Sequence, residues 1–515
     1  MSRKRSRHLV STLVGTMAAG ALLLSPTAIA DPHPVAPPNL PGVADLPGPI
    51  APQSSPASGG LKLLAVEPAS GPIRTKFTLS AEKLPANAAI DIVWATSIVR
   101  YVLNPMPDNV EYHGRKIDKV DVVLAKTKTD AAGKLAVELT APEDYGDVHD
   151  IYAVSAGKQL AKGGFQINRQ ISVSPSSGPV GAPITITTTG LGSLPYTSTV
   201  AVLYDNHYAG FISATTTRGS AKVQIRAAGP VGVKTIEVAP ASAAVPYLDI
   251  EQSAVSFVGK YRTKFRVTRD NGPPRTRVEL PAPVQPTESS RTTMTASAAP
   301  AVTASLSKQS GIVLTKVDVK ATGLDPNAPV SLQWMTAVGT RATASGWQLQ
   351  ALPLGQVKST ADGSLDTTIL VPDNLGGWHT VQILQGGKVK AELPFYVLRS
   401  FLSVSPQTVK EGEVFTIHLK GVGWTELDNG FAVTYDNNYI GYACGFYSRG
   451  DVTMNMVATG GPGTHLIDLY PMIYKGKGND TWLDQVPLLN FRKDAPGLAL
   501  GYRIPAIRIA IKVTK

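Results

Sequence analysis

The feature that most constrains the fold of this chain is a long internal repeat. Residues 171–240 align with residues 402–471 without a gap, and 23 of the 70 positions are identical. Many identical positions are glycines or prolines at a constant offset, such as Gly190 with Gly421. Because glycine and proline mark unusual or fixed backbone angles, the same turns are expected twice. The chain should therefore fold into two similar halves.

The regions that precede these segments repeat as well. Trp94 recurs 240 positions later as Trp334, and His149 recurs 230 positions later as His379. The first half thus carries about ten extra residues between these landmarks, within YVLNPMPDNVEYHGRKID. The repeated unit is a pair of modules in the order A-B-A-B, and the four modules are called A1, B1, A2 and B2 below.

Each module contains a run in which apolar and polar residues alternate. The runs are TKFTLSA, PITITTTG, TKVDVKATG and FTIHLKG. A period of two is typical of a β-strand with one buried face. Short strands about ten residues apart, in units of about 100 residues, predict antiparallel sandwiches. We therefore predict an all-β chain of four tandem immunoglobulin-like β-sandwich domains, arranged as a duplicated pair.

Some longer segments resemble a known family. SPSSGPVGAPITITTTGLG and ADGSLDTTILVPDNLGGWHTVQIL are similar to immunoglobulin-like modules of bacterial exported proteins, including the IPT/TIG type. The resemblance covers nearly all of residues 61–492. It implies surface display, adhesion, ligand binding or a spacer role beside another domain. Because this fold hosts many functions, the resemblance supports the architecture more than any one activity.

The beginning of the chain has the pattern of an export signal. A basic start is followed by an apolar stretch and by Ala28-Ile29-Ala30, so we expect cleavage after Ala30 and a secreted, extracellular or envelope location. No later segment has the roughly 18 consecutive apolar residues of a transmembrane helix. The expected boundaries are signal peptide 1–30, Pro-rich disordered linker 31–60, A1 61–168, B1 169–270, linker 271–302, A2 303–398, and B2 399–515 with a basic C-terminal strand.

Charge and cysteine content narrow the chemistry. Removal of the signal peptide, which has four basic and no acidic residues, lowers the formal charge from +11 to +7 (45 Lys and Arg against 38 Asp and Glu). This mild excess suits either an ordinary soluble surface or attraction to anionic polymers. The single cysteine, Cys444, excludes an internal disulfide and a cysteine-based metal site. We expect a small apolar filler there, with a reactive thiol as the alternative.

The most similar stretches of the two halves are YDNHYAGFISATTTRG, from Tyr204, and YDNNYIGYACGFYSRG, from Tyr435. Each predicts a tight hairpin with an Asp-Asn turn and tyrosines packed across strands. The alternative is a pair of glycan-binding faces, in which rings stack on sugars and Asp and Asn bind hydroxyls. The candidate ligand-binding residues are Tyr204, Asp205, Asn206, Tyr208, Phe211, Arg218, Tyr435, Asp436, Asn437, Tyr439, Tyr442 and Arg449. One carboxylate per turn is too few to predict a calcium site.

Three histidines occupy matching places in their modules. These are His149, His379 and His465, and the fourth module has Lys234 there. A position that accepts His or Lys predicts a solvent-facing strand residue rather than a metal ligand or general base. The sequence contains no zinc-protease motif, no nucleophile elbow and no phosphate-binding loop. We therefore expect no catalytic residue, no metal and no cofactor.

Both halves end in a strand with basic residues on one face. In KYRTKFRVTR the four basic residues of 260–266 share a face, and near the C-terminus Arg508 and Lys512 do the same. One interpretation is an edge strand whose charges prevent association between sheets. The other is a stripe that binds an anionic wall polymer.

Together these features predict a non-enzymatic secreted or cell-surface protein that acts in adhesion or in envelope or ligand binding. One alternative is a glycan-binding protein that uses the two Tyr-Asp-Asn hairpins, and another is an enzyme with a site between modules. The expected partner is an envelope polysaccharide or another surface protein. Nucleic acid is not expected, because the chain has no recognition motif for it.

Overall fold

The computed structural model describes residues 49–50, 60–106, 109–194, 197–242, 244–246, 248, 261–281, 296–339, 347–445, 449–473, 486–490, 494 and 504–515. All of these belong to one compact unit, residues 37–515. Every regular element within them is a β-strand, so the all-β prediction is confirmed. The predicted signal peptide and most of the first linker lie outside the described residues. No described helix has the length and apolar character needed to cross a bilayer.

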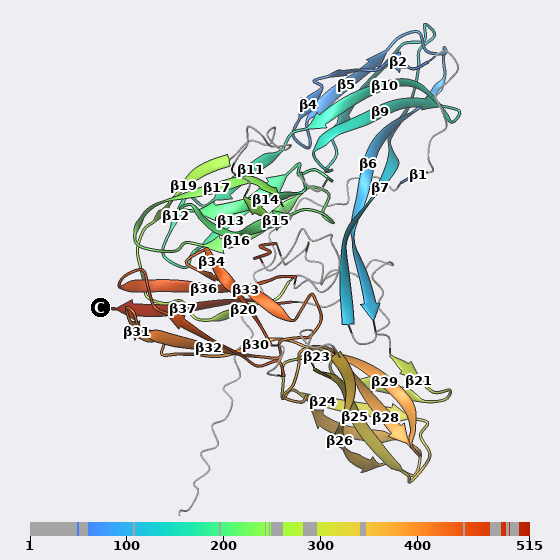
Figure 1. Ribbon diagram of the computed structural model, residues 1–515. Helices are drawn as coiled ribbons and strands as arrows, with labels where there is room; N and C mark the ends of the chain where they lie inside the picture. The colour runs from blue at the N-terminus through green and yellow to red at the C-terminus, as the bar shows by residue number, and fades with distance from the viewer. Residues whose placement is uncertain are drawn as a thin grey trace, which may run out of the picture. The chain divides into compact units, whose positions relative to one another are not determined.

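Eight sheets form four groups, each with one small and one large sheet (Figure 1). The small sheets all have three antiparallel strands in the same chain order. They are β3 (Ala65–Glu67), β5 (Lys76–Ala81) and β8 (Leu135–Thr140) in A1; β11 (Gln170–Ser174), β13 (Pro183–Thr189) and β16 (Ala221–Arg226) in B1; β22 (Thr303–Leu306), β24 (Lys316–Thr322) and β27 (Leu365–Leu370) in A2; and β30 (Ser400–Ser405), β32 (Val414–Lys420) and β35 (Val452–Val457) in B2.

The large sheets share a core of two hairpins laid side by side. The hairpin strands, in sheet order, are β7 (Asn109–Lys128), β6 (Ala89–Met106), β9 (Asp147–Ser155) and β10 (Lys158–Ile167) in A1; β15 (His207–Ser213), β14 (Thr199–Tyr204), β17 (Gly232–Ser242) and β19 (Tyr261–Val267) in B1; β26 (Trp347–Lys358), β25 (Pro329–Gly339), β28 (Gly377–Gln385) and β29 (Lys388–Val397) in A2; and β34 (Asn438–Cys444), β33 (Gly430–Tyr435), β36 (Gly463–Pro471) and β37 (Ala506–Thr514) in B2. The four modules thus have one immunoglobulin-like topology.

Short strands complete the large sheets. They are β1 (Pro49–Ile50), β2 (Lys62–Leu63) and β4 (Ser70–Gly71) in A1, β12 (Ser177–Gly178) and β18 (Val245–Pro246) in B1, β21 (Ser297–Ala298) and β23 (Ser310–Gly311) in A2, and β20 (Arg277–Glu279) and β31 (Thr408–Lys410) in B2. Strands β20 and β21 both fall within the predicted linker 271–302. Because β20 pairs with β37, this linker reaches B2 before the chain has entered A2.

The alternating runs form the strands that the sequence predicts. In β5 and β24 the apolar residues are buried and the polar residues between them are exposed or half-buried. Trp94 and Trp334 lie fully buried at equivalent places in the A1 and A2 cores. The repeat therefore preserves core positions as well as turns.

The ten extra residues of the first half lengthen one hairpin. Strands β6 and β7 pair continuously from Ala89 and Lys128 to Met106 and Asn109, apart from two bulges. Near its tip the hairpin contacts other modules: the backbone N–H of Tyr112 donates to Glu426 of B2 at 2.6 Å. The insertion is thus a contact arm rather than a loose loop.

The large sheet of B2 is buried on both of its faces. Ile467 and Ile509, paired across β36 and β37, point into the B2 core. Their neighbours Leu466 and Ala510 pack instead into the core of B1, together with Tyr470. One module therefore covers the outer face of the other.

A charged cluster lies within this contact. Asp468 accepts from the Arg226 side chain of B1 and pairs with Arg508, with N–O distances of 2.5 and 3.2 Å. Arg508 also pairs with Glu279 of β20 at 3.3 Å, and Glu279 pairs with Arg277. The prediction that Arg508 belongs to an exposed basic stripe is wrong, because β37 is an inner strand and this side chain is 4% exposed. In B1 the basic residues of β19 are exposed, as an exposed basic face requires.

The predicted solvent-facing histidines are buried. His149 stacks on Trp94 at 4.4 Å, and its ring nitrogens lie 2.8 and 2.7 Å from the carbonyl oxygens of Ala95 and Tyr145. His379 repeats this arrangement on Trp334, and burial lowers its pKa despite three backbone hydrogen bonds. The position tolerates polarity because each ring bridges a strand and a loop through their backbone carbonyls, not because it faces water.

Candidate functional site

The two Tyr-Asp-Asn hairpins form the turns that the sequence predicts. The φ angles of Asp205 and Asn206 are 48° and 65°, and those of Asp436 and Asn437 are 49° and 62°. Two successive left-handed residues match the right-handed twist of the flanking strands, and Asp and Asn tolerate this conformation. The carboxylates are bonded within their modules. Asp205 pairs with Lys234 at 3.1 Å, and Asp436 lies 2.6 Å from His465 Nδ1.

These two ion pairs explain the exchange of His for Lys noted above. His465 and Lys234 occupy the same position and reach the same turn carboxylate. Burial lowers the pKa of His465, but hydrogen bonding and charge from Asp436 raise it more, so the pKa of His465 is raised overall. At this place His and Lys are interchangeable, since either side chain can bind the turn carboxylate.

The first tyrosine of each motif fixes the module corner. Tyr204 OH donates to Ala228 O at 2.9 Å, and Tyr435 OH donates to Thr459 O at 2.8 Å, in both cases 24 residues along the chain. Burial raises the pKa of both phenols, that of Tyr435 to about 12. The Tyr204 ring is fully packed in the B1 core and offers no face to a sugar.

The second tyrosines bring the two motifs together. The rings of Tyr208 and Tyr439 meet edge to face at 6.4 Å. Tyr208 OH donates to Ala244 O at 2.6 Å, and Asn437 Nδ2 donates to Arg226 O at 2.7 Å. The hairpins therefore contact each other at the boundary of B1 and B2 instead of forming two separate, equal sites.

The third aromatic residues differ between the copies. Phe211 is buried, and its backbone exchanges hydrogen bonds of 3.0 Å with Pro487 and Leu489. Tyr442, at the equivalent position of β34, is 48% exposed. Among the predicted ligand-binding residues of both copies, the aromatic ring with a large exposed area is thus that of Tyr442 in B2.

The closing Arg-Gly pairs form the junction between A and B modules. Arg218 and Arg449 have φ angles of 50° and 51°, and each precedes a glycine with positive φ. A Cβ at Gly219 would lie 3.0 Å from the Cα of Tyr145, and one at Gly450 would lie 3.0 Å from the Cα of Leu375. The motif is repeated because both halves join their modules through the same close backbone contact. Arg449 is exposed, whereas Arg218 is half-buried.

Two groups in this region were not predicted. Asp494 accepts four hydrogen bonds of 2.5 to 2.8 Å from Ser213, Thr215 and Thr216. An apolar cluster with members from all four modules includes Tyr101, Phe211, Tyr396 and Leu427. The signal that could have revealed it is the aromatic content of the inserted arm, which has Tyr101 in β6 and Tyr112 in β7.

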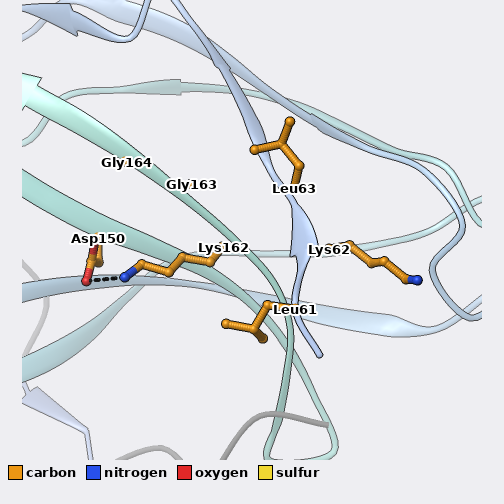
Figure 2. A pocket seen from close by; sticks show the side chains of 7 residues that line it. All are labelled: Leu61, Lys62, Leu63, Asp150, Lys162, Gly163 and Gly164. Atoms are coloured by element: carbon orange, nitrogen blue, oxygen red, sulfur yellow. Dashed lines mark ion pairs between the residues drawn. The ribbon is translucent and has the colours of Figure 1, made fainter. Parts of the chain in front are cut away.

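A shallow hollow lies apart from the hairpins, on A1, where β2 pairs with β10 (Figure 2). Its volume is about 530 Å³. It is lined by Leu61, Lys62, Leu63, Asp150, Lys162, Gly163 and Gly164. Lys162 and Asp150 form a 2.8 Å ion pair across its floor, and this hydrogen bond raises the pKa of Lys162. Two of the three charged side chains that line the hollow are thus bonded to each other, and the third is Lys62.

Metal ligands do not gather in the described part of the chain, where no three His, Cys, Asp or Glu side chains are placed to share an ion. Cys444 is half-buried, and burial raises the pKa of its thiol to about 12. The thiol is therefore held in its protonated form at neutral pH, as expected for a small apolar filler.

No protein-family model and no curated protein matches the chain. Among solved structures, invasin, a bacterial integrin-binding protein, aligns over 87% of this chain and 78% of its own, with 11% identity and a TM-score of 0.17. The ICAM-5 D1–D4 ectodomain fragment aligns over 83% of this chain and 99% of its own, with 13% identity and a TM-score of 0.17.

Salmonella alpha-2-macroglobulin gives 9% identity and a TM-score of 0.17 over 86% of this chain. This chain spans only 30% of the length of that protein. At such TM-scores the similarities carry no argument about function.

Proposed function

We propose that this protein is a non-enzymatic secreted or cell-surface protein that acts in adhesion or ligand binding through its tandem modules. The observation that supports this proposal most is the buried contact of B1 and B2 around Arg226, Asp468 and Arg508. A contact of this kind fixes the spacing between the exposed surfaces of two modules. Fixed spacing favours simultaneous binding to an extended partner, because the second contact is then intramolecular.

The chemistry of the hairpins supports a structural rather than a catalytic use of their polar groups. The phenols of Tyr204 and Tyr435 donate to backbone carbonyls, and the Asp436 carboxylate binds His465. These groups stabilise turns and module corners. Under this proposal no catalytic residue, metal or cofactor takes part, and residues 1–30 direct export. The immunoglobulin-like resemblance of the IPT/TIG type belongs to the same proposal.

A second candidate function, glycan binding, is favoured by one observation on B2. Tyr442 presents nearly half of its surface, and the exposed guanidinium of Arg449 follows seven residues later. An exposed ring with a polar tip suits stacking on a sugar. The binding site would then be single and confined to B2, in contrast to the two equal sites predicted from the sequence.

The test is retention of the mature chain, residues 31–515, by isolated bacterial envelopes and by purified envelope polysaccharide. We expect retention by envelopes, and loss of retention after protease treatment would assign the partner as a surface protein. Retention by purified polysaccharide that falls at least tenfold in the Tyr442→Ala variant would assign the glycan site. Leu402→Ala, an exposed change elsewhere on B2, is the matched control. Absence of retention by both materials would overturn the proposal.

A further inference from the structure

Strand β26 forms the outer edge of the large sheet of A2. It has 12 residues, and among the described strands it pairs with β25 alone. The side chains of 348–351 are all exposed, and Leu349 is 50% exposed. From Trp347 to Val357 the strand contains no charged residue. A long, uncharged and exposed edge presents main-chain groups that can pair with another strand.

The corresponding edges of A1 and B1 each pair in part with another segment of the chain. In A1, β1 pairs with β7 at Val122. In B1, Leu488 bridges to Phe211 in parallel, with hydrogen bonds on both sides of this residue. At the edge that corresponds to β26, A1 thus pairs with a two-residue strand and B1 with a single bridging residue.

Charge also separates the A1 edge from the A2 edge. The pairings of Trp94 with Val122 and of Trp334 with Leu352 align the two strands at an offset of 230 residues. At this offset Asp118, Lys119 and Asp121 of β7 stand where β26 has Gln348, Leu349 and Ala351. Charges on an edge strand oppose unwanted pairing. The A1 edge is therefore charged, and the corresponding A2 edge is neutral.

We propose that β26 pairs antiparallel with β26 of a second copy of this chain, which joins two A2 sheets across a twofold axis. A neutral strand meets no like charge when it pairs with itself, and a twofold contact uses the same surface on both partners. Pro353 has no N–H to donate, so it limits the pairing to residues Trp347–Leu352. This contact does not depend on the ligand proposed above.

The experiment measures the mass of the full mature chain by sedimentation velocity from micromolar to several hundred micromolar concentration. We expect a reversible, concentration-dependent dimer. The triple variant Gln348→Asp, Leu349→Lys, Ala351→Asp transfers the A1 pattern to β26 and should weaken dimerisation by about tenfold or more. This variant should fold, because A1 carries the same residues at equivalent positions of the same sheet.

The matched control is Val389→Lys, which adds charge to an exposed position on β29 of the same module. This control should dimerise like the parent chain. Hydrogen exchange at high concentration should protect peptides from β26 in the parent and not in the triple variant. A chain that stays monomeric over the whole range would overturn the proposal, and so would a dimer that the triple variant leaves unchanged.

Discussion

Replacing Asp468 by Asn should loosen the contact between B1 and B2 far more than its size suggests. The carboxylate is 2% exposed and lies between the guanidinium groups of Arg226 and Arg508. Asn keeps the shape but removes the charge, so two buried cations remain near Glu279. Removal of one member of a buried ionic group costs about 3–5 kcal/mol, because the remaining charges lose their compensation.

The internal repeat supplies a matched control for this variant. Glu237 of β17 aligns with Asp468, and its partner Arg262 aligns with Arg508 across equivalent strand pairs. In B1, however, the Arg262 side chain is 64% exposed. Ion pairs at such exposure contribute about 0–1 kcal/mol, so Glu237→Gln should have a small effect.

Hydrogen exchange monitored by mass spectrometry can measure both changes in the full chain. A four-module chain need not unfold in a single step, so a local measurement is preferable to a global one. Because every 1.4 kcal/mol is a tenfold change, amides of β36 and β37 in Asp468→Asn should lose about 150-fold or more in protection. Unchanged protection there, or an equal loss in β17 for Glu237→Gln, would refute the reasoning.

Three further predictions follow from buried polar groups. The pKa of His379 is lowered, so this residue should destabilise the fold as pH falls below about 6.5. The pKa of His465 is raised, so the stability that this residue contributes should be lost as pH rises through that pKa. An imidazole NMR titration in which His379 takes up its proton at higher pH than His465 would contradict this. Asp144→Asn leaves one carbonyl oxygen where the carboxylate accepts two hydrogen bonds of 2.9 Å, from Trp94 Nε1 and from the backbone N–H of Tyr145. One buried donor then loses its acceptor, so A1 should be destabilised by about 1–3 kcal/mol in urea unfolding followed by fluorescence; an unchanged midpoint would count against it. Because the pKa of the Cys444 thiol is about 12, alkylation at pH 8 should be much slower in the folded than in the unfolded chain, and equal rates measured by mass spectrometry would disprove this.

The sequence predicted those parts of the fold that local rules determine. Alternation in TKFTLSA placed Phe77 and Leu79 inside, and the Asp205-Asn206 pair predicted a left-handed turn. Both outcomes depend on residues close together in the chain. The duplicated glycines likewise predicted that the same turns occur in both halves, because a turn depends on residues close together in the chain.

Contacts between modules were not predicted, because their partners lie hundreds of residues apart. From its place in an alternating strand, Arg508 is expected to be an exposed basic residue. It is buried because Arg226 and β20, which are distant in the sequence, pack against it. One signal was nevertheless present. The strand GTHLIDLYP has Leu466 and Tyr470 where its counterpart GVKTIEVAP has Thr235 and Ala239. This loss of polar alternation indicates a strand that is covered on both sides.

The doubly covered sheet of B2 has an evolutionary consequence. A newly copied half can be deleted without harm only while the other half does not depend on its contacts. In this chain Leu466 and Tyr470 pack into the core of B1, and Asp468 pairs with Arg226 of the other half, so excision of that half would expose apolar side chains and an unpaired carboxylate. Loss of one copy should therefore destabilise the other, which favours retention of both halves.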